Sequence, residues 1–181
     1  MPLPTFPDTV AARTGFRQAM RQLAGGVSVI TAASGQSRTG MTVSSVISVA
    51  MDPPELLVSV NQQASSWSVI QATRRFGVNV LASHQGQVAR RFSGQGGLQG
   101  EQRYEGAVWQ RTPEGVWLLQ GALAALVCEL VQVQLYRGHA LLIARVTGLN
   151  AGPPDAGPLL YWQGNYGLLA APAGRESSLA V

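Results

Sequence analysis

Two long segments with β-strand character, close together in the second half of the chain, limit the fold more than any other feature. Residues 122–136 and 140–149 are rich in Val, Leu and Ala, and Gly138 falls in the turn between them. Shorter strands are expected at 27–32, 40–50, 56–60, 76–81 and 159–162, and short helices at 14–23, 67–74 and 83–92. The glycine-rich segment 93–106 is expected to be a mobile loop. Because strands and helices do not alternate regularly, a doubly wound fold is excluded. The pattern predicts a mainly β protein, an antiparallel barrel with short helices packed outside.

The low content of charged residues further restricts the class of protein. Charged residues make up 12% of the 181 residues and hydrophobic residues 46%, which excludes a disordered chain. All 13 basic residues are arginine, so mechanisms that depend on a lysine are excluded as well. A chain with so few charges has to cover much of its surface, and we expect it to form an oligomer. The length predicts one domain at 14–169, a flexible N-terminal arm at 1–13 and a flexible C-terminal tail at 170–181.

Several classes of function are disfavoured. The arginines are scattered rather than gathered in a stripe, which argues against nucleic-acid binding. One cysteine and two histidines, with no carboxylate at ligand spacing, argue against a metal site. No apolar run reaches the length of a membrane span, and no signal peptide is recognised, so we expect no membrane partner and a cytoplasmic location. No nucleophile elbow is present, so any chemistry is expected to come from a bound cofactor.

A run of small hydroxyl side chains at 40–49 is the first candidate binding element. If this run is one strand, Thr42, Ser44 and Ser48 share a face, where a flat ring could lie close to the backbone. An ordinary solvated strand face would show the same pattern.

Three further places have both a binding and a plain structural interpretation. Ser65 and Ser66 stand at an expected helix start, where N–H groups and the helix dipole suit a phosphate, or where a serine simply caps the helix. Arg90 and Arg91 are phosphate candidates or part of a solvated helix face. His139, in the expected turn between the long strands, contacts a ligand at a barrel mouth or is a surface residue.

Taken together and in order, several motifs resemble the flavin reductase family, whose fold is the FMN-binding split barrel. They lie at 16–20, 26–31, 40–49, 52–54, 76–81, 89–92, 121–124 and 158–161, with Gln85 between them. The resemblance implies reduction of FMN or FAD by NADH or NADPH, a homodimer, and a partner monooxygenase that receives the reduced flavin.

The resemblance also implies roles for individual residues. Thr42, Val43, Ser44 and Ser45 match the segment along the flavin ring and ribityl chain, and Asn61, Ser65 and Ser66 match the segment that lines its phosphate. Asn79, Arg90, Arg91 and Phe92 match segments that approach the flavin. His139 matches a histidine near the nicotinamide, but Gly138 stands where the family has aspartate. A flavin carrier, an electron-transfer module or another flavin oxidase on the same barrel remain as alternatives.

Overall fold

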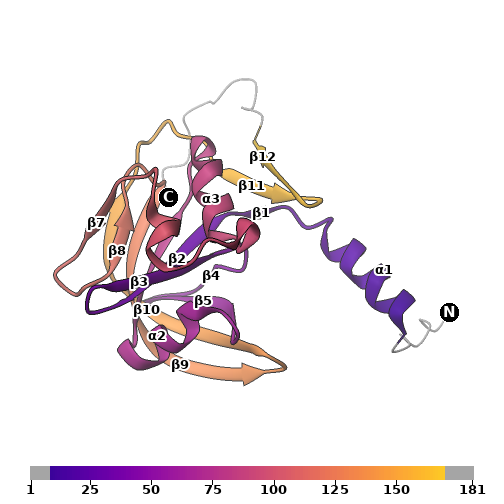
Figure 1. Ribbon diagram of the computed structural model, residues 1–181, viewed down its shortest axis with the longest axis horizontal. Helices are drawn as coiled ribbons and strands as arrows, with labels where there is room; N and C mark the ends of the chain where they lie inside the picture. The colour runs from indigo at the N-terminus through magenta and orange to yellow at the C-terminus, as the bar shows by residue number, and fades with distance from the viewer. Residues whose placement is uncertain (1–8, 170–181) are drawn as a thin grey trace.

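The two long strands form the predicted hairpin. The computed structural model describes residues 9–169, in which β9 (Ala124–Tyr136) pairs antiparallel with β10 (His139–Ala151). The turn between them consists of Arg137 and Gly138, which have φ values of 43° and 82°. Glycine adopts such positive φ values without steric cost, which explains its place in this turn. The hairpin is the centre of the main sheet (Figure 1).

The main sheet has seven antiparallel strands in the order β3-β2-β6-β9-β10-β5-β4. Its other members are β2 (Ser28–Ser34), β3 (Ser37–Val43), β4 (Ile47–Met51), β5 (Pro54–Asn61) and β6 (Arg75–Val80). The two edge strands, β3 and β4, are consecutive in the chain. In a flat sheet they would lie about 29 Å apart, whereas the link from Val43 to Ile47 spans at most about 15 Å. The sheet must therefore curl, and the mainly β split-barrel expectation is confirmed.

Neighbouring residues of β2 point into two separate hydrophobic clusters. Ile30 packs in one cluster with Ile70 of α2 (Ser65–Thr73), and Val29 packs in the other with Phe92 of α3 (Gly86–Phe92). Successive strand residues point to opposite faces, so β2 is buried on both sides. Each short helix thus closes one of the two clusters.

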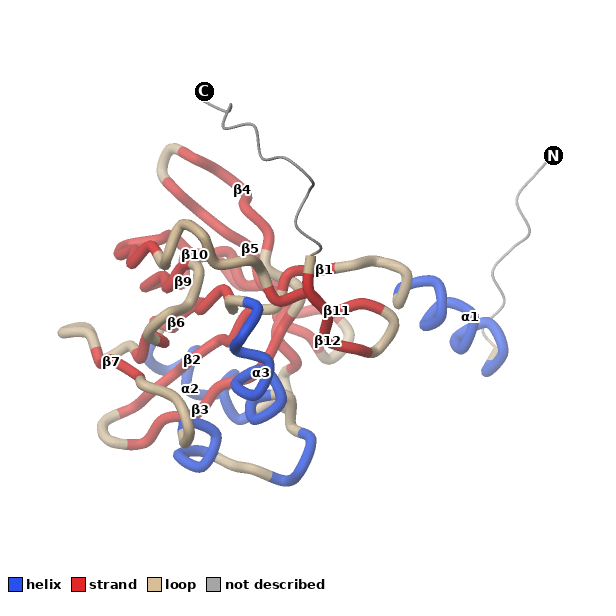
Figure 2. The backbone as a smooth tube through the Cα atoms, turned by 90° about the horizontal axis from the view of Figure 1, so that it is seen from above, coloured by secondary structure: helices blue, strands red, loops and turns tan. Residues whose placement is uncertain are grey.

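The remaining strands of the described residues form two small sheets. β1 (Gly25–Gly26), β11 (Leu159–Trp162) and β12 (Asn165–Leu168) form a three-stranded sheet, and β7 (Trp109–Arg111) pairs with β8 (Trp117–Leu119). Figure 2 shows β1, β11 and β12 on the side of the body that faces α1 (Val10–Met20). β11 was predicted with the observed bounds, whereas β1, β7, β8 and β12 were not predicted.

The first helix stands apart from the body and buries none of its residues (Figure 1). It begins at Val10, because the Thr9 side chain caps it by accepting a hydrogen bond from the Ala12 amide at 3.1 Å. The predicted start at Thr14 was therefore wrong, and residues 10–13 of the predicted arm are helical. The rest of that arm up to residue 8, and the predicted tail 170–181, lie outside the described residues.

Two other expectations were wrong. The strand predicted at 40–50 is broken at residues 44–46, where the chain crosses from β3 to β4. The segment at 93–106, expected to be a mobile loop, contains the short 3-10 helices η2 (Gln95–Gly97) and η3 (Gly100–Tyr104), and it buries Tyr104. A third 3-10 helix, η1 (Ser83–Gln85), precedes α3. Across residues 9–169 we find no helix long and apolar enough to cross a membrane.

Candidate functional site

Two clefts lie along β3 and share two lining residues, Thr42 and Ser93. The hairpin cleft, of about 300 Å³, is lined by residues that include Val43, Ser44, Arg90, Tyr161, Asn165 and Tyr166. The helix cleft, of about 600 Å³, is lined by residues that include Thr39, Asn61, Ala64, Ser65, Phe92 and Arg103. The structure thus brings most of the predicted binding residues to one side of β3, divided between two adjoining spaces.

The close packing of α3 on β3 depends on Gly40. A Cβ atom at this position would lie 2.4 Å from the Ile30 carbonyl oxygen and 2.7 Å from Cε1 of Phe92. Thr42 then fastens the two elements, because its hydroxyl donates to the Ala89 carbonyl oxygen at 2.7 Å. The wall shared by the two clefts is therefore held by one glycine and one hydrogen bond.

The two serines that follow in the chain, Ser44 and Ser45, differ in their contacts. Ser44 is exposed and lines the hairpin cleft. Ser45 instead holds the crossing segment against β5: its hydroxyl donates to the Ser59 carbonyl oxygen at 3.0 Å and accepts from the Ser59 amide at 3.3 Å. Because β3 ends at Val43, the prediction of a single face shared by positions 42, 44 and 48 was wrong.

The N-terminus of α2 opens onto the helix cleft. Its N-cap is Ala64, which has no side chain that could cap the helix, so the expectation of a serine cap was wrong. Ser65, the first helical residue, hydrogen-bonds through its hydroxyl to that of Thr39 at 2.6 Å. Ser66 is fully buried, and its hydroxyl is the one buried side-chain polar atom without a partner in the described part of the chain. Free N–H groups and the positive end of the helix dipole suit an anion.

Arg103, which the sequence analysis missed, supplies a cation to the same cleft. Its guanidinium donates to the carbonyl oxygens of Leu98, at 3.0 Å, and of Gly40. These bonds fix the side chain where it lines the helix cleft together with Asn61 and Ser65. The only sequence signal was an arginine inside a glycine-rich segment of a chain without lysine.

The two consecutive arginines of α3 differ in their surroundings. Arg91 is engaged by the loop that follows, donating to Glu105 Oε2 at 2.9 Å and to the carbonyl oxygens of Gln102 and Arg103. Arg90 lines the hairpin cleft, with its guanidinium carbon 5.3 Å from the centre of the Tyr166 ring. Of these two arginines, only Arg90 therefore lines one of the two clefts.

Two predicted residues have mainly structural contacts. The Asn79 side chain is fully buried, donating to the Val29 carbonyl oxygen at 3.1 Å and accepting from the Leu119 amide at 2.7 Å. Both its polar ends are thus used to join strands. Phe92 is buried with its ring centre 5.0 Å from that of Tyr104, and it reaches the helix cleft with part of its surface.

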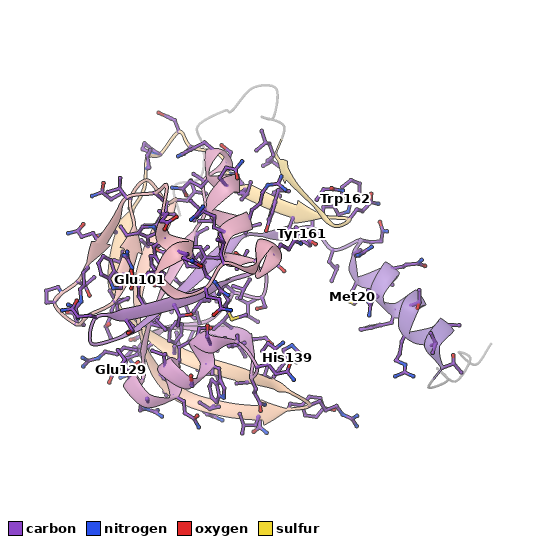
Figure 3. The ribbon with its side chains drawn as sticks, viewed as in Figure 1. Met20, Glu101, Glu129, His139, Tyr161 and Trp162 are labelled. Carbon is purple, nitrogen blue, oxygen red and sulfur yellow. The ribbon has the colours of Figure 1, made fainter. Side chains whose placement is uncertain are left out.

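His139 is the first residue of β10 rather than part of the turn, and it lies opposite Asn61 in the strand register. Its side chain is exposed, and its carbonyl oxygen accepts a hydrogen bond from Gln62 Nε2 at 2.8 Å. Figure 3 shows it near the turn end of the hairpin formed by β9 and β10. The register places it beside the helix cleft without making it part of the lining.

Burial raises the pKa of two tyrosines of this region, Tyr166 and Tyr104. The pKa of Tyr166 is raised by loss of solvent and by the neighbouring Tyr161, against the opposing effect of Arg90. The pKa of Tyr104 is raised by burial as well, and its hydroxyl donates to the Thr39 carbonyl oxygen at 2.6 Å. The clefts therefore combine arginine charge with neutral hydroxyls at neutral pH. In the described residues no group of three His, Cys, Asp or Glu side chains is placed to hold a metal ion.

An elongated ligand with an aromatic ring at one end and a phosphate at the other matches these two adjoining spaces. The helix cleft offers an arginine, hydroxyls and a helix N-terminus for the phosphate. The hairpin cleft offers tyrosine rings and a backbone edge for the ring system. The fold is therefore a split barrel with two adjoining clefts that could hold such a ligand.

Comparison with known proteins identifies the family. Residues 20–170 match the model of the flavin reductase like domain. The reductase component of the FADH(2)-dependent resorcinol hydroxylase of Rhizobium sp. is 38% identical over 161 residues, covering 88% of each protein. The FMN reductase (NADH) RutF of Cronobacter sakazakii is 32% identical over 163 residues, covering 90% of this chain and 96% of the relative.

A solved structure agrees with the sequence relatives. The NADH:FAD oxidoreductase SgcE6 of Streptomyces globisporus, in complex with NAD and FAD fragments, superimposes with a TM-score of 0.82 at 26% identity, covering 96% of this chain and all of the other. This chain belongs to the flavin reductase family and is an enzyme of that class.

Proposed function

We propose that this enzyme uses NADH or NADPH to reduce FMN or FAD and releases the reduced flavin to a partner monooxygenase. The observation that carries the proposal is the pair of clefts joined at Thr42, in a chain whose flavin reductase match covers both. The reductase components among its relatives support the monooxygenase partner.

The residues along β3 fit the two ends of a flavin. Ser65, Asn61 and the N-terminus of α2, with Arg103, are assigned to the ribityl phosphate, and the unpartnered Ser66 hydroxyl lies in the same helical turn. Thr42, Val43 and Ser44 are assigned to the ring. When flavin and nicotinamide are bound together, a hydride passes from C4 of the nicotinamide to N5 of the flavin, and no protein acid or base is needed at either atom. The chain has to orient the rings and exclude water.

The activity is tested by following NADH and NADPH oxidation with FMN, FAD and riboflavin as acceptors. We expect one nicotinamide and at least one phosphorylated flavin to give turnover far above the reaction without protein. Oxidation no faster than this chemical background, with every combination, would overturn the proposal.

His139 is assigned to the nicotinamide. Replacement of this exposed histidine, His139→Ala, is expected to raise KM for the preferred nicotinamide about tenfold and to leave flavin affinity unchanged. The matched control is His84→Ala, in η1, which should alter neither constant. Equal losses for nicotinamide and flavin, or no loss at all, would refute the assignment.

We also propose that the enzyme is a homodimer assembled through α1. This helix of 11 residues is too short to be stable alone in water, yet none of its residues is buried in the chain. Apolar side chains remain exposed on it and just beyond it, Met20 at 44% and Leu23 at 65%. Figure 3 shows Met20 on the separated helix and Trp162 on β11, the strand nearest to it.

Light scattering measures the oligomeric state directly. The native chain should have the mass of a dimer, and Met20→Glu should shift it towards the monomer, because a charge would be placed in the buried interface. Val108→Glu changes another exposed apolar residue, at 63%, away from α1, and should leave the dimer intact. A native monomer, or a dimer insensitive to Met20→Glu, would refute this interface.

A further inference from the structure

Arg90 is a cation without a carboxylate partner. Across residues 9–169 no Asp or Glu forms an ion pair with it, whereas its neighbour Arg91 is paired with Glu105 at 2.9 Å. Its recorded contact is with the face of the Tyr166 ring, 5.3 Å from the guanidinium carbon. An aromatic face orients a guanidinium but does not neutralise it, so the hairpin cleft holds a positive charge.

Among the described residues that line the cleft, no acidic side chain compensates the charge of Arg90. Arg90 lies in the last turn of α3, where the helix dipole favours a cation. The cleft is completed by the hydroxyl-bearing end of β3 and by Tyr161, Asn165 and Tyr166 of the β11–β12 hairpin, none of which carries charge while the tyrosines are protonated. The raised pKa of Tyr166 keeps its hydroxyl neutral well above neutral pH.

A phosphate is the less suitable partner for Arg90. The helix cleft already contains its own cation, Arg103, together with the N-terminus of α2 and Ser65. Arg90 instead shares its cleft with Thr42, Val43 and Ser44, the residues assigned to the flavin ring. That ring is neutral when oxidised and gains negative charge on its pyrimidine portion when it accepts a hydride. A fixed cation beside it therefore favours the reduced form.

We infer that Arg90 is the residue that recognises the negative charge of reduced flavin, so that this cleft binds the reduced form in preference to the oxidised form. The inference rests on the proposed function, because it takes the ligand of the hairpin cleft to be a flavin ring. Preferential binding of the reduced form makes hydride acceptance more favourable. By linkage, the logarithm of the ratio of the two dissociation constants sets the shift in the reduction potential of the bound flavin.

The experiment measures dissociation constants for oxidised and reduced flavin, the latter under anaerobic conditions, with both FMN and riboflavin. For Arg90→Gln we expect the preference for the reduced form to fall about tenfold, which for a two-electron couple lowers the midpoint potential of the bound flavin by about 30 mV. The fall should be the same for FMN and riboflavin, since riboflavin has no phosphate. Arg90→Lys should retain most of the preference, because it keeps the charge.

Arg91→Gln is the matched control and should leave the ratio unchanged, since the neighbouring charge is used in the ion pair with Glu105. Circular dichroism and thermal unfolding establish that each variant is folded. If Arg90→Gln weakens FMN equally in both redox states and spares riboflavin, Arg90 binds the phosphate and the inference is wrong. An unchanged ratio for both flavins would also overturn it.

The results for the native enzyme and for Arg90→Gln distinguish a failure of this inference from a failure of the proposed function. Native enzyme that binds flavin and oxidises NAD(P)H, with an unaltered ratio in Arg90→Gln, refutes only the role of Arg90. Native enzyme that binds no flavin in either state refutes the proposed function and this inference together.

Discussion

The hairpin cleft and the helix cleft lie side by side on β3, but they are built in different ways. The helix cleft has its arginine fixed by backbone carbonyls and a helix N-terminus that is part of the main body. The hairpin cleft has an arginine whose guanidinium lies over an aromatic face, opposite a two-stranded hairpin at the periphery. On the proposed function, the helix cleft suits a permanent charge such as a phosphate, and the hairpin cleft suits a charge that is present only in the reduced flavin ring.

The largest effect is expected from disturbing the wall that both clefts share, because this would damage both clefts at once. Gly40→Ala places a Cβ atom 2.4 Å from the Ile30 carbonyl oxygen and against Phe92, and backbone cannot move aside cheaply. We expect a loss of about 3 kcal/mol in the free energy of unfolding and loss of flavin binding, measured by chemical denaturation and fluorescence titration. Gly26→Ala, where the added atom meets open space, should cost less than about 1 kcal/mol. Comparable stabilities for the two variants would contradict this account of the wall.

A substitution with a smaller expected effect distinguishes the two clefts, because it should weaken the binding of FMN but not of riboflavin. Arg103→Gln removes the cation of the helix cleft, and a charge-assisted hydrogen bond contributes about 2 kcal/mol, so FMN affinity should fall roughly thirtyfold. Riboflavin affinity should stay unchanged. Arg111→Gln, which removes an exposed arginine elsewhere, is the control. If riboflavin is weakened as strongly as FMN, the phosphate has been assigned to the wrong cleft.

The smallest effect concerns Thr42, one of the two residues that line both clefts. Thr42→Val removes the hydroxyl that donates to the Ala89 carbonyl oxygen, at a cost of about 1 kcal/mol. Because this bond positions β3 against α3 for both clefts, FMN and riboflavin should be weakened by the same factor, about fivefold, in titrations of each flavin. Thr42→Ser keeps the hydroxyl and should restore most of the affinity. A loss confined to FMN would show that Thr42 serves one cleft alone.

The sequence predicted those parts of the fold that rest on local patterns. The hairpin of β9 and β10 and the strand β11 were recognisable because apolar runs and turn residues lie next to each other in the chain. The break at 44–46 was not, because Val43, Val46 and Ile47 continue a strand-like pattern locally. What forces the break is the need to join opposite edges of one sheet, a property of the whole fold.

The candidate site shows the same limit. Thr42, Ser44, Ser65 and Arg90 could be selected from the sequence, and the structure places each of them in a cleft. Arg103 could not, because its position depends on how a glycine-rich segment folds back onto Gly40. Likewise Arg90 and Arg91 look equivalent as neighbours in the sequence, and only the ion pair with Glu105 distinguishes them.

The turn between β11 and β12 is bonded to the end of α1, so formation of the proposed dimer would affect ligand affinity. The Gln163 amide donates to the Arg21 carbonyl oxygen at 3.1 Å, and its side chain meets that of Gln22, so the hairpin that closes the Arg90 cleft is tied to the end of α1. A helix that docks on a second copy would hold this hairpin in place through the same bonds. Assembly and flavin binding would then be thermodynamically linked, and the measured flavin affinity should decline as the enzyme is diluted below the dissociation constant of its dimer.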